Sequence, residues 1–234
     1  MKTVLKMQDI SKIYHVGEQD CIALHHIDLE IYEGEMVVVL GPSGSGKSTL
    51  LNLIGAIDTP STGSVKVEGV DISNLKENEL SEYRAQHIGF IFQFYNLIPT
   101  LSAYENVALN KELVSDYVDP QKALEMVGLA QRSNHFPPQL SGGEQQRASI
   151  ARAIAKKPTI LLCDEPTGAL DTQTGQEILS LLQNMSKEQN KTVIMVTHNS
   201  DFAALADRVV YLRDGVIEKI ITNTIRKNAN EVSW

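Results

Sequence analysis

The residues best suited to chemistry form a loop at positions 41–48, Gly-Pro-Ser-Gly-Ser-Gly-Lys-Ser, which is a complete phosphate-binding pattern. The loop follows the apolar run Met36–Leu40, and we expect a helix to begin near Lys47. Glycines allow backbone N–H groups to surround phosphate oxygens, and the helix start adds partial positive charge. Lys47 would reach the β- and γ-phosphates of a nucleotide, and Ser48 would bind Mg²⁺. The expected nucleotide contacts are Gly41, Pro42, Ser43, Gly44, Ser45, Gly46, Lys47, Ser48 and Thr49.

Two adjacent acids, Asp164 and Glu165, follow the apolar stretch Thr159–Cys163. Parallel strands present functional side chains at their carboxyl ends, where the phosphate loop also lies. Adjacent carboxylates repel each other near a core, and a Mg²⁺ ion removes that cost. We expect Asp164 to hold Mg²⁺ through its water shell and Glu165 to polarise an attacking water. A solvated acid pair at a strand end is the alternative, and the phosphate loop in the same chain argues against it.

The segment Leu140–Arg147 reads Leu-Ser-Gly-Gly-Glu-Gln-Gln-Arg and begins an expected helix. Ser141 is a favourable N-cap, and Glu144 three residues later completes a capping box. Capping does not account for Gly142 and Gly143, because each glycine weakens a helix by about 1 kcal/mol. We expect the two glycines to leave the helix end bare, so that a phosphate can approach it closely.

In this order and spacing, the three segments resemble the nucleotide-binding subunits of ABC transporters, and the resemblance covers nearly the whole chain. It implies ATP and Mg²⁺ as cofactors and hydrolysis of ATP. It further implies that Tyr14 stacks on adenine, that Gln93 senses Mg²⁺ and the γ-phosphate, and that His198 contacts the γ-phosphate. The implied catalytic residues are Lys47, Gln93, Glu165 and His198. The implied metal ligands are Ser48, Gln93 and Asp164. The segment Gly168-Ala169-Leu170-Asp171 matches the D-loop of the family.

The resemblance also implies a homodimer in which two ATP molecules are sandwiched between subunits that face each other head to tail. The signature segment of one subunit would close over the phosphate loop of the other. The contacts made in this way would come from Ser141, Gly142, Gly143 and Glu144.

Longer stretches of the sequence are similar to the MacB/LolD group of ABC transporter subunits, whose members drive macrolide or peptide export and lipoprotein release. These stretches include GPSGSGKSTLLNLIG, LSGGEQQRASIARA and DEPTGALD. The implied partner is a separate integral membrane permease of the MacB, LolC/LolE or FtsX type. The loop Phe92–Pro99 carries four large apolar side chains after Gln93. These side chains either tuck under neighbouring helices or form a docking patch, and we favour docking. The stretch Asn106–Ser141 is shorter than the group pattern, which leaves the type of permease open.

Three other functions remain open. A cell-division ATPase of the same fold would signal through a membrane partner without moving cargo, and it shares every catalytic motif. A soluble ATPase of the ribosome or DNA-repair type would have two tandem nucleotide domains or a long coiled-coil insert, and this chain shows neither. A non-enzymatic nucleotide-binding module would not need the combination of Lys47, Asp164, Glu165 and His198.

The elements that must position these residues alternate between strands and helices, which predicts an α/β fold with a mostly parallel sheet. After strand-like segments within residues 3–40, strands are expected at 63–69, 87–92, 159–163, 192–196 and 208–212, and helices at 102–110, 120–127 and 141–156. We predict one P-loop NTPase domain of ABC type over residues 1–234, with a helical subdomain at about 94–156 and a loose polar tail at about 222–234. The resemblance adds an antiparallel β subdomain.

Composition limits the partners. The chain has 234 residues and a formal net charge of −8, and it lacks the basic face of a duplex-binding protein, so we expect no nucleic acid partner. Cys21 and Cys163 are far apart and are expected to be free thiols in a reducing compartment. No apolar stretch approaches the ~18 residues of a membrane helix, and the first ten residues lack the apolar core of a signal peptide. We therefore expect a cytoplasmic protein, peripheral at the inner face of the cell membrane.

Overall fold

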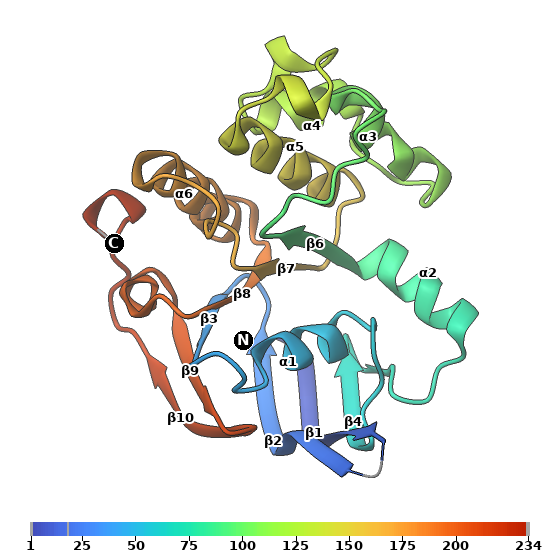
Figure 1. Ribbon diagram of the computed structural model, residues 1–234, viewed down its shortest axis with the longest axis vertical. Helices are drawn as coiled ribbons and strands as arrows, with labels where there is room; N and C mark the ends of the chain where they lie inside the picture. Colours follow the sequence, from blue (N-terminus) through green and yellow to red (C-terminus); the bar gives the residue numbers. More distant parts are fainter. Residues whose placement is uncertain (1, 18, 233–234) are drawn as a thin grey trace.

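The computed structural model describes residues 2–17 and 19–232, and two β-sheets form its framework (Figure 1). The larger sheet has the order β10-β9-β3-β8-β7-β6, and all neighbouring strands in it are parallel except β9 and β10. This sheet confirms the predicted α/β core of the P-loop type. Its strands are β3 (Met36–Leu40), β6 (Ile88–Phe92), β7 (Ile160–Asp164), β8 (Thr192–Thr197), β9 (Arg208–Arg213) and β10 (Val216–Thr222).

The smaller sheet has the order β2-β1-β4-β5, and each of its neighbouring pairs is antiparallel. It corresponds to the antiparallel β subdomain that the resemblance implied. Figure 1 shows it beside helix α1, which follows the phosphate loop. Its strands are β1 (Thr3–Val16), β2 (Gln19–Tyr32), β4 (Thr62–Val67) and β5 (Val70–Asp71), and α1 spans Lys47–Ile54.

The larger sheet is covered on both faces, which explains why β3 is apolar without interruption. All five β3 residues are buried, and successive side chains point to opposite faces. Val37 and Val39 pack in the cluster that contains α1 and the antiparallel sheet. Val38 packs in the other cluster, which contains the helices of the opposite face. The phosphate loop therefore begins at the end of a strand that is held from both sides.

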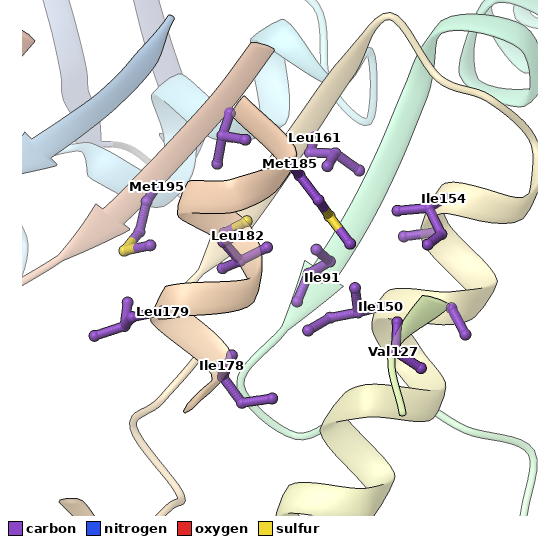
Figure 2. Close-up of a cluster of buried hydrophobic side chains, with 14 of the residues drawn as sticks. Ile91, Val127, Ile150, Ile154, Leu161, Ile178, Leu179, Leu182, Met185 and Met195 are labelled. Atoms are coloured by element: carbon purple, nitrogen blue, oxygen red, sulfur yellow. The ribbon is translucent and has the colours of Figure 1, made fainter. Parts of the chain in front are cut away.

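The chain between β6 and β7 forms a group of helices that lies above the sheet in Figure 1. Figure 2 shows how this group is attached: Ile150 and Ile154 of α5 point toward Ile91 of β6, next to side chains of α6. One continuous apolar core therefore joins the helical group to the sheet. The elements are α3 (Ala103–Ala108), η1 (Leu109–Glu112), α4 (Pro120–Met126), η2 (Ala130–Arg132), η3 (Pro137–Gln139) and α5 (Gly142–Ala155), close to the predicted helices.

Several elements were not predicted, and for different reasons. Helix α2 (Glu77–His87) buries only Leu80 and Tyr83, so it carries almost no apolar periodicity, and its last residue was assigned to the next strand. Helix α6 (Thr172–Gln189) does have a helical pattern, which our prediction omitted. The edge strand β10 and the 3₁₀ turn η4 (Ser200–Leu205) were also missed.

The prediction of a loose tail was wrong for the described part of the segment 222–232. Ala229 in η5 (Ala229–Glu231) and Val232 are buried, with 1% and 4% of their surfaces exposed. The amide of Gln176 on α6 donates to the carbonyl of Val232 at 2.9 Å. Two apolar residues are too few to form a period in the sequence, so the packing of this segment on the domain could not be predicted. Trp234 lies outside the described residues. In the described part of the chain, no helix combines the length and apolarity required to cross a bilayer.

Candidate nucleotide site

The predicted site residues emerge from one edge of the larger sheet because the strands are in register. Phe92 lies opposite Asp164 across the β6–β7 pair, and Asp164 lies opposite Val196 across the β7–β8 pair. Leu40 lies opposite Thr197 across the β3–β8 pair. The residues that follow these strand ends are the phosphate loop, Gln93, Glu165 and His198. Sheet register thus brings together groups that are far apart in the sequence.

Close backbone contacts fix the shape of the phosphate loop. A side chain at Gly41 would place its Cβ 2.0 Å from the carbonyl oxygen of Leu212. Gly46 has a φ of +100°, and a Cβ added there would lie 2.5 Å from the carbonyl oxygen of Ala23. Only glycine tolerates such positions. The Lys47 ammonium donates to the carbonyls of Gly41 and Pro42 at 2.8 and 2.9 Å, so it lies inside the loop.

Lys47 and the two acids at the end of β7 share one electrostatic environment. Burial lowers the pKa of Lys47, and the charges of Glu165 and Asp164 act in the opposite direction. Burial raises the pKa of Asp164, the neighbouring Glu165 raises it further, and Lys47 lowers it. The site is therefore short of positive charge beside Asp164, which a bound cation would supply.

The donor set fits Mg²⁺ better than a metal held entirely by the protein. The described residues contain no group of three or more His, Cys, Asp or Glu side chains that could hold a metal ion. Asp164, Ser48 and Gln93 offer one carboxylate, one hydroxyl and one amide oxygen. Mg²⁺ typically keeps several waters and binds through one or two carboxylates together with substrate phosphates, which a donor set with a single carboxylate fits.

The Glu165 carboxylate is held by the end of the neighbouring strand β8. Its Oε2 accepts a hydrogen bond from the Thr197 hydroxyl at 2.9 Å, and its Oε1 accepts from the backbone N–H of His198 at 2.9 Å. The His198 imidazole Nδ1 lies 2.7 Å from the same Oε1. Glu165 itself has a positive φ of 47°, and its backbone N–H donates to the carbonyl of Val196. Thr197 was missed by sequence reasoning, although it directly precedes a predicted site residue.

Gln93 and the signature helix both contact the loop that follows Glu165. A Cβ at Gly168 would lie 2.8 Å from Nε2 of Gln93, so the Gln93 amide packs directly on the predicted D-loop. On α5, the buried Gln146 donates to the carbonyl of Pro166 at 2.8 Å. The loop after the acid pair therefore lies between the end of β6 and the start of α5.

The signature segment starts α5 with the predicted capping box. The Ser141 hydroxyl accepts from the N–H of Glu144 at 3.3 Å, and the Glu144 carboxylate accepts from the N–H of Ser141 at 2.8 Å. The glycines have a packing explanation that the sequence did not reveal. A Cβ at Gly143 would lie 2.3 Å from Cγ2 of Thr174 on α6, and one at Gly142 would lie 2.8 Å from the Tyr95 hydroxyl. Close approach to Thr174 on α6 thus explains glycine at position 143, whereas the neighbour of Gly142 is the end of a tyrosine side chain that can shift.

Tyr14 is anchored on β1 by two residues that the sequence did not single out. Its hydroxyl donates to Asp58 at 2.8 Å, and the Lys12 ammonium lies 4.9 Å from the ring centroid while also donating to Asp58. The cation therefore occupies one face of the ring.

Comparison with known proteins decides the family. The profile of the family described as ABC transporter matches residues 24–168, more than half of the chain. The chain belongs to the ABC transporter family. Over 225 residues it is 44% identical to the ABC transporter ATP-binding protein MJ0796 of Methanocaldococcus jannaschii, covering 92% of this chain and 96% of that protein. It is 40% identical to the lipoprotein-releasing system ATP-binding protein LolD of Shewanella frigidimarina, covering 94% of each chain.

Two further comparisons concern a longer protein and a solved structure. The chain is 44% identical to the macrolide export ATP-binding/permease protein MacB of Rhodopirellula baltica, covering 98% of this chain but 34% of that protein. The dimeric structure of a post-hydrolysis state of MJ0796, bound to ADP and Pi, superimposes with a TM-score of 0.86 at 42% identity, covering 93% of this chain and 98% of that one. These findings confirm the predicted resemblance, the ABC fold and the enzyme class: this chain is an ABC ATPase cassette.

Proposed function

We propose that this ABC cassette hydrolyses ATP as a homodimer at the cytoplasmic face of the membrane and thereby powers a separate integral membrane permease. The observation that carries the proposal is the meeting of the phosphate loop, Glu165 and His198 at one sheet edge. The relatives support the partner. In MacB of Rhodopirellula baltica, the matched third belongs to a protein named for both ATP binding and a permease.

The geometry of the strand ends supports the following roles in our proposal. Lys47 neutralises charge on the β- and γ-phosphates, and the glycine-lined loop donates its backbone N–H groups. Ser48, Gln93 and Asp164 would hold Mg²⁺, which when bound would offset the negative charge of the phosphates. Glu165 orients the attacking water and accepts its proton. His198, within hydrogen-bonding distance of Glu165, contacts the γ-phosphate.

The signature segment acts across the homodimer. Ser141 is exposed and Gly142 is partly exposed, so the start of α5 is accessible to a second copy. In our proposal Ser141, Gly142, Gly143 and Glu144 close over the nucleotide of the partner. ATP then favours the closed dimer, and hydrolysis allows the dimer to open again.

The loop after Gln93 transmits this change to the permease. The Phe94 side chain is 73% exposed and Ile98 is 40% exposed, while Leu97 packs against the core. In our proposal this exposed pair contributes to a docking patch for the permease, directly after Gln93 in the chain. Because the patch lies on the helical group around residues 94–156, we assign permease docking to this subdomain.

The test is affinity purification of the full chain from gently solubilised native membranes, followed by mass spectrometry of the co-purifying proteins. A stoichiometric integral membrane protein is the expected result. Recovery of a soluble partner alone would overturn the transporter role and leave the ATPase chemistry intact. A membrane partner of the cell-division type that moves no cargo in a vesicle transport assay would replace transport by mechanical signalling.

A further inference from the structure

The turn between strands β9 and β10 lies against the phosphate loop, although the two segments are far apart in the sequence. Strand β9 runs parallel to β3, with Tyr211 opposite Leu40, so the chain that leaves β9 passes beside the loop that follows β3. The backbone N–H of Gly215 in this turn donates to the carbonyl of Ser45 at 3.2 Å. The phosphate loop is therefore in direct backbone contact with the β9–β10 turn.

Gly215 also joins the turn to strand β2 of the antiparallel sheet. Its carbonyl accepts from the backbone N–H of His25 at 2.8 Å, and Figure 1 shows the end of the β9–β10 hairpin beside β2. A Cβ at position 215 would lie 2.9 Å from the carbonyl oxygen of Ala23, so a side chain does not fit there unless the backbone shifts. The same carbonyl oxygen limits Gly46 of the phosphate loop. The turn, β2 and the phosphate loop therefore meet at one point.

The hydrogen bond from Gly215 fixes the direction of one peptide group in the phosphate loop. The Ser45 carbonyl points toward the turn, because it accepts from the Gly215 N–H. In a trans peptide the carbonyl and the following N–H point in opposite directions, so the N–H of Gly46 points away from the turn. Phosphate-binding loops direct successive backbone N–H groups at one anion. A shift of the turn would therefore redirect one of the donors that the loop offers to a nucleotide phosphate.

The chain contains a second turn with the same backbone pattern, between β4 and β5. Both turns have two residues between paired strands, with φ values of 48° and 76° at Asp214 and Gly215 and of 49° and 86° at Glu68 and Gly69. Positive φ favours glycine at the second position of both turns. Among the described residues, a Cβ at Gly69 would have no neighbour within 4 Å, whereas one at Gly215 would meet the backbone of β2. Backbone conformation thus explains Gly69, and Gly215 has a close contact in addition.

We propose that the β9–β10 turn positions the phosphate loop for nucleotide binding, and that Gly215 is the positioning residue that holds the peptide between Ser45 and Gly46 in its binding orientation. In this role Gly215 acts through the Ser45 carbonyl and not by touching the nucleotide. The inference rests on the proposed function, because it assumes that the backbone N–H groups of residues 41–48 bind the phosphates.

The test compares ATP binding by Gly215→Ala and Gly69→Ala in the full chain, with Kd measured by equilibrium titration. Both substitutions force alanine into positive φ, so we expect each to lower Tm by about 2–8 °C. We expect Kd for ATP to rise about tenfold or more in Gly215→Ala, which is the effect of misdirecting one hydrogen bond to a charged group. Gly69→Ala should bind ATP with the wild-type Kd.

Inorganic triphosphate shows whether the effect lies at the phosphates. It would use the phosphate loop as ATP does but has no base or ribose, so its Kd in Gly215→Ala should rise by the same factor as the Kd for ATP. Wild-type Kd values in Gly215→Ala would overturn the inference. An equal rise in Gly69→Ala, or a rise for ATP without one for inorganic triphosphate, would overturn it as well.

Asparagine provides a second pair of variants if Gly215→Ala does not fold, because asparagine tolerates positive φ better than alanine does. Gly215→Asn keeps the crowding against the carbonyl of Ala23, and Gly69→Asn is its control. We expect the same difference in Kd between these two variants. Equal Kd values in the asparagine pair would contradict the positioning role.

Lys47→Ala separates this inference from the proposed function. If Lys47→Ala binds and hydrolyses ATP as the wild type does, the proposed role of the phosphate loop fails and this inference fails with it. If Lys47→Ala is impaired and Gly215→Ala binds ATP with the wild-type Kd, only this inference fails.

Discussion

The Thr197 hydroxyl donates a hydrogen bond of 2.9 Å to Oε2 of Glu165, the residue that follows the adjacent strand β7. The same hydroxyl accepts from the backbone N–H of Asn199 at 3.1 Å, so its direction is set by the turn after β8. His198 holds the other carboxylate oxygen. Both oxygens of Glu165 are therefore positioned by β8, although Glu165 follows β7.

Thr197→Val keeps the shape of a side chain that is 1% exposed but removes the donor to Glu165. We expect kcat for ATP hydrolysis to fall about tenfold to a hundredfold, because small displacements of a reacting group have effects of this size. KM for ATP should remain unchanged, and Thr197→Ser should restore most of the rate. Steady-state kinetics check this. A wild-type kcat for Thr197→Val, or an altered KM alone, would contradict the positioning role.

Tyr14→Ala should raise KM for ATP about tenfold, in line with the loss of one base-stacking contact. Tyr14→Phe keeps the ring and loses only the hydrogen bond to Asp58, so we expect a much smaller increase. Competition between ATP and a triphosphate without a base separates stacking from phosphate binding. An unchanged KM for Tyr14→Ala would show that adenine lies elsewhere.

Gly143→Ala distinguishes close packing from helix propensity. Alanine favours a helix by about 1 kcal/mol over glycine, so an uncrowded site would gain thermal stability. An alanine Cβ at position 143 would lie 2.3 Å from Thr174 Cγ2, so we expect thermal stability to fall instead. We expect Tm to fall by about 3–10 °C, which corresponds to overpacking of about 1–3 kcal/mol. Adding Thr174→Ser to this variant removes the crowded methyl group and should recover most of the lost Tm. A Gly143→Ala protein whose Tm equals or exceeds that of the wild type would refute the packing explanation.

Lys156→Met should raise the free energy of unfolding at pH 7, because Lys156 is largely buried and the only charge that acts on it among the described residues is the positive Arg152. The pKa of Lys156 is lowered from 10.5 to about 8. Between these values the unfolded chain binds more protons than the folded one, so wild-type stability rises with pH. Arg152 stays charged, and Asp116 and Lys157 pair with each other. In urea unfolding, we expect the free energy of unfolding of Lys156→Met to exceed that of the wild type by about 1–3 kcal/mol at pH 7, and this excess to shrink toward pH 10. An excess that is equal at both pH values would contradict this explanation.

The elements of the site that could be predicted from the sequence are those encoded by local pattern. The phosphate loop follows a continuous apolar run, and the acid pair ends another, so both strand ends were predictable. The capping box of Ser141 and Glu144 is also local, with partners three residues apart.

The remaining features depend on partners that only the fold brings close. Thr197 reaches Glu165 across 32 positions, and Asp58 reaches Tyr14 across 44. Gly143 looked unexplained because its crowded neighbour, Thr174, lies on another helix. The segment around Ala229 looked like a loose tail because its burial comes from contacts with other elements and not from its own periodicity.

The most direct test of the central claim measures ATP turnover by the Glu165→Gln variant at saturating ATP and Mg²⁺, with ATP binding measured on the same preparation. The account predicts binding close to wild type and turnover lowered about a hundredfold or more, as expected for loss of a general base. Wild-type turnover in this variant would contradict the assignment of Glu165 and, with it, the chemistry proposed for the site.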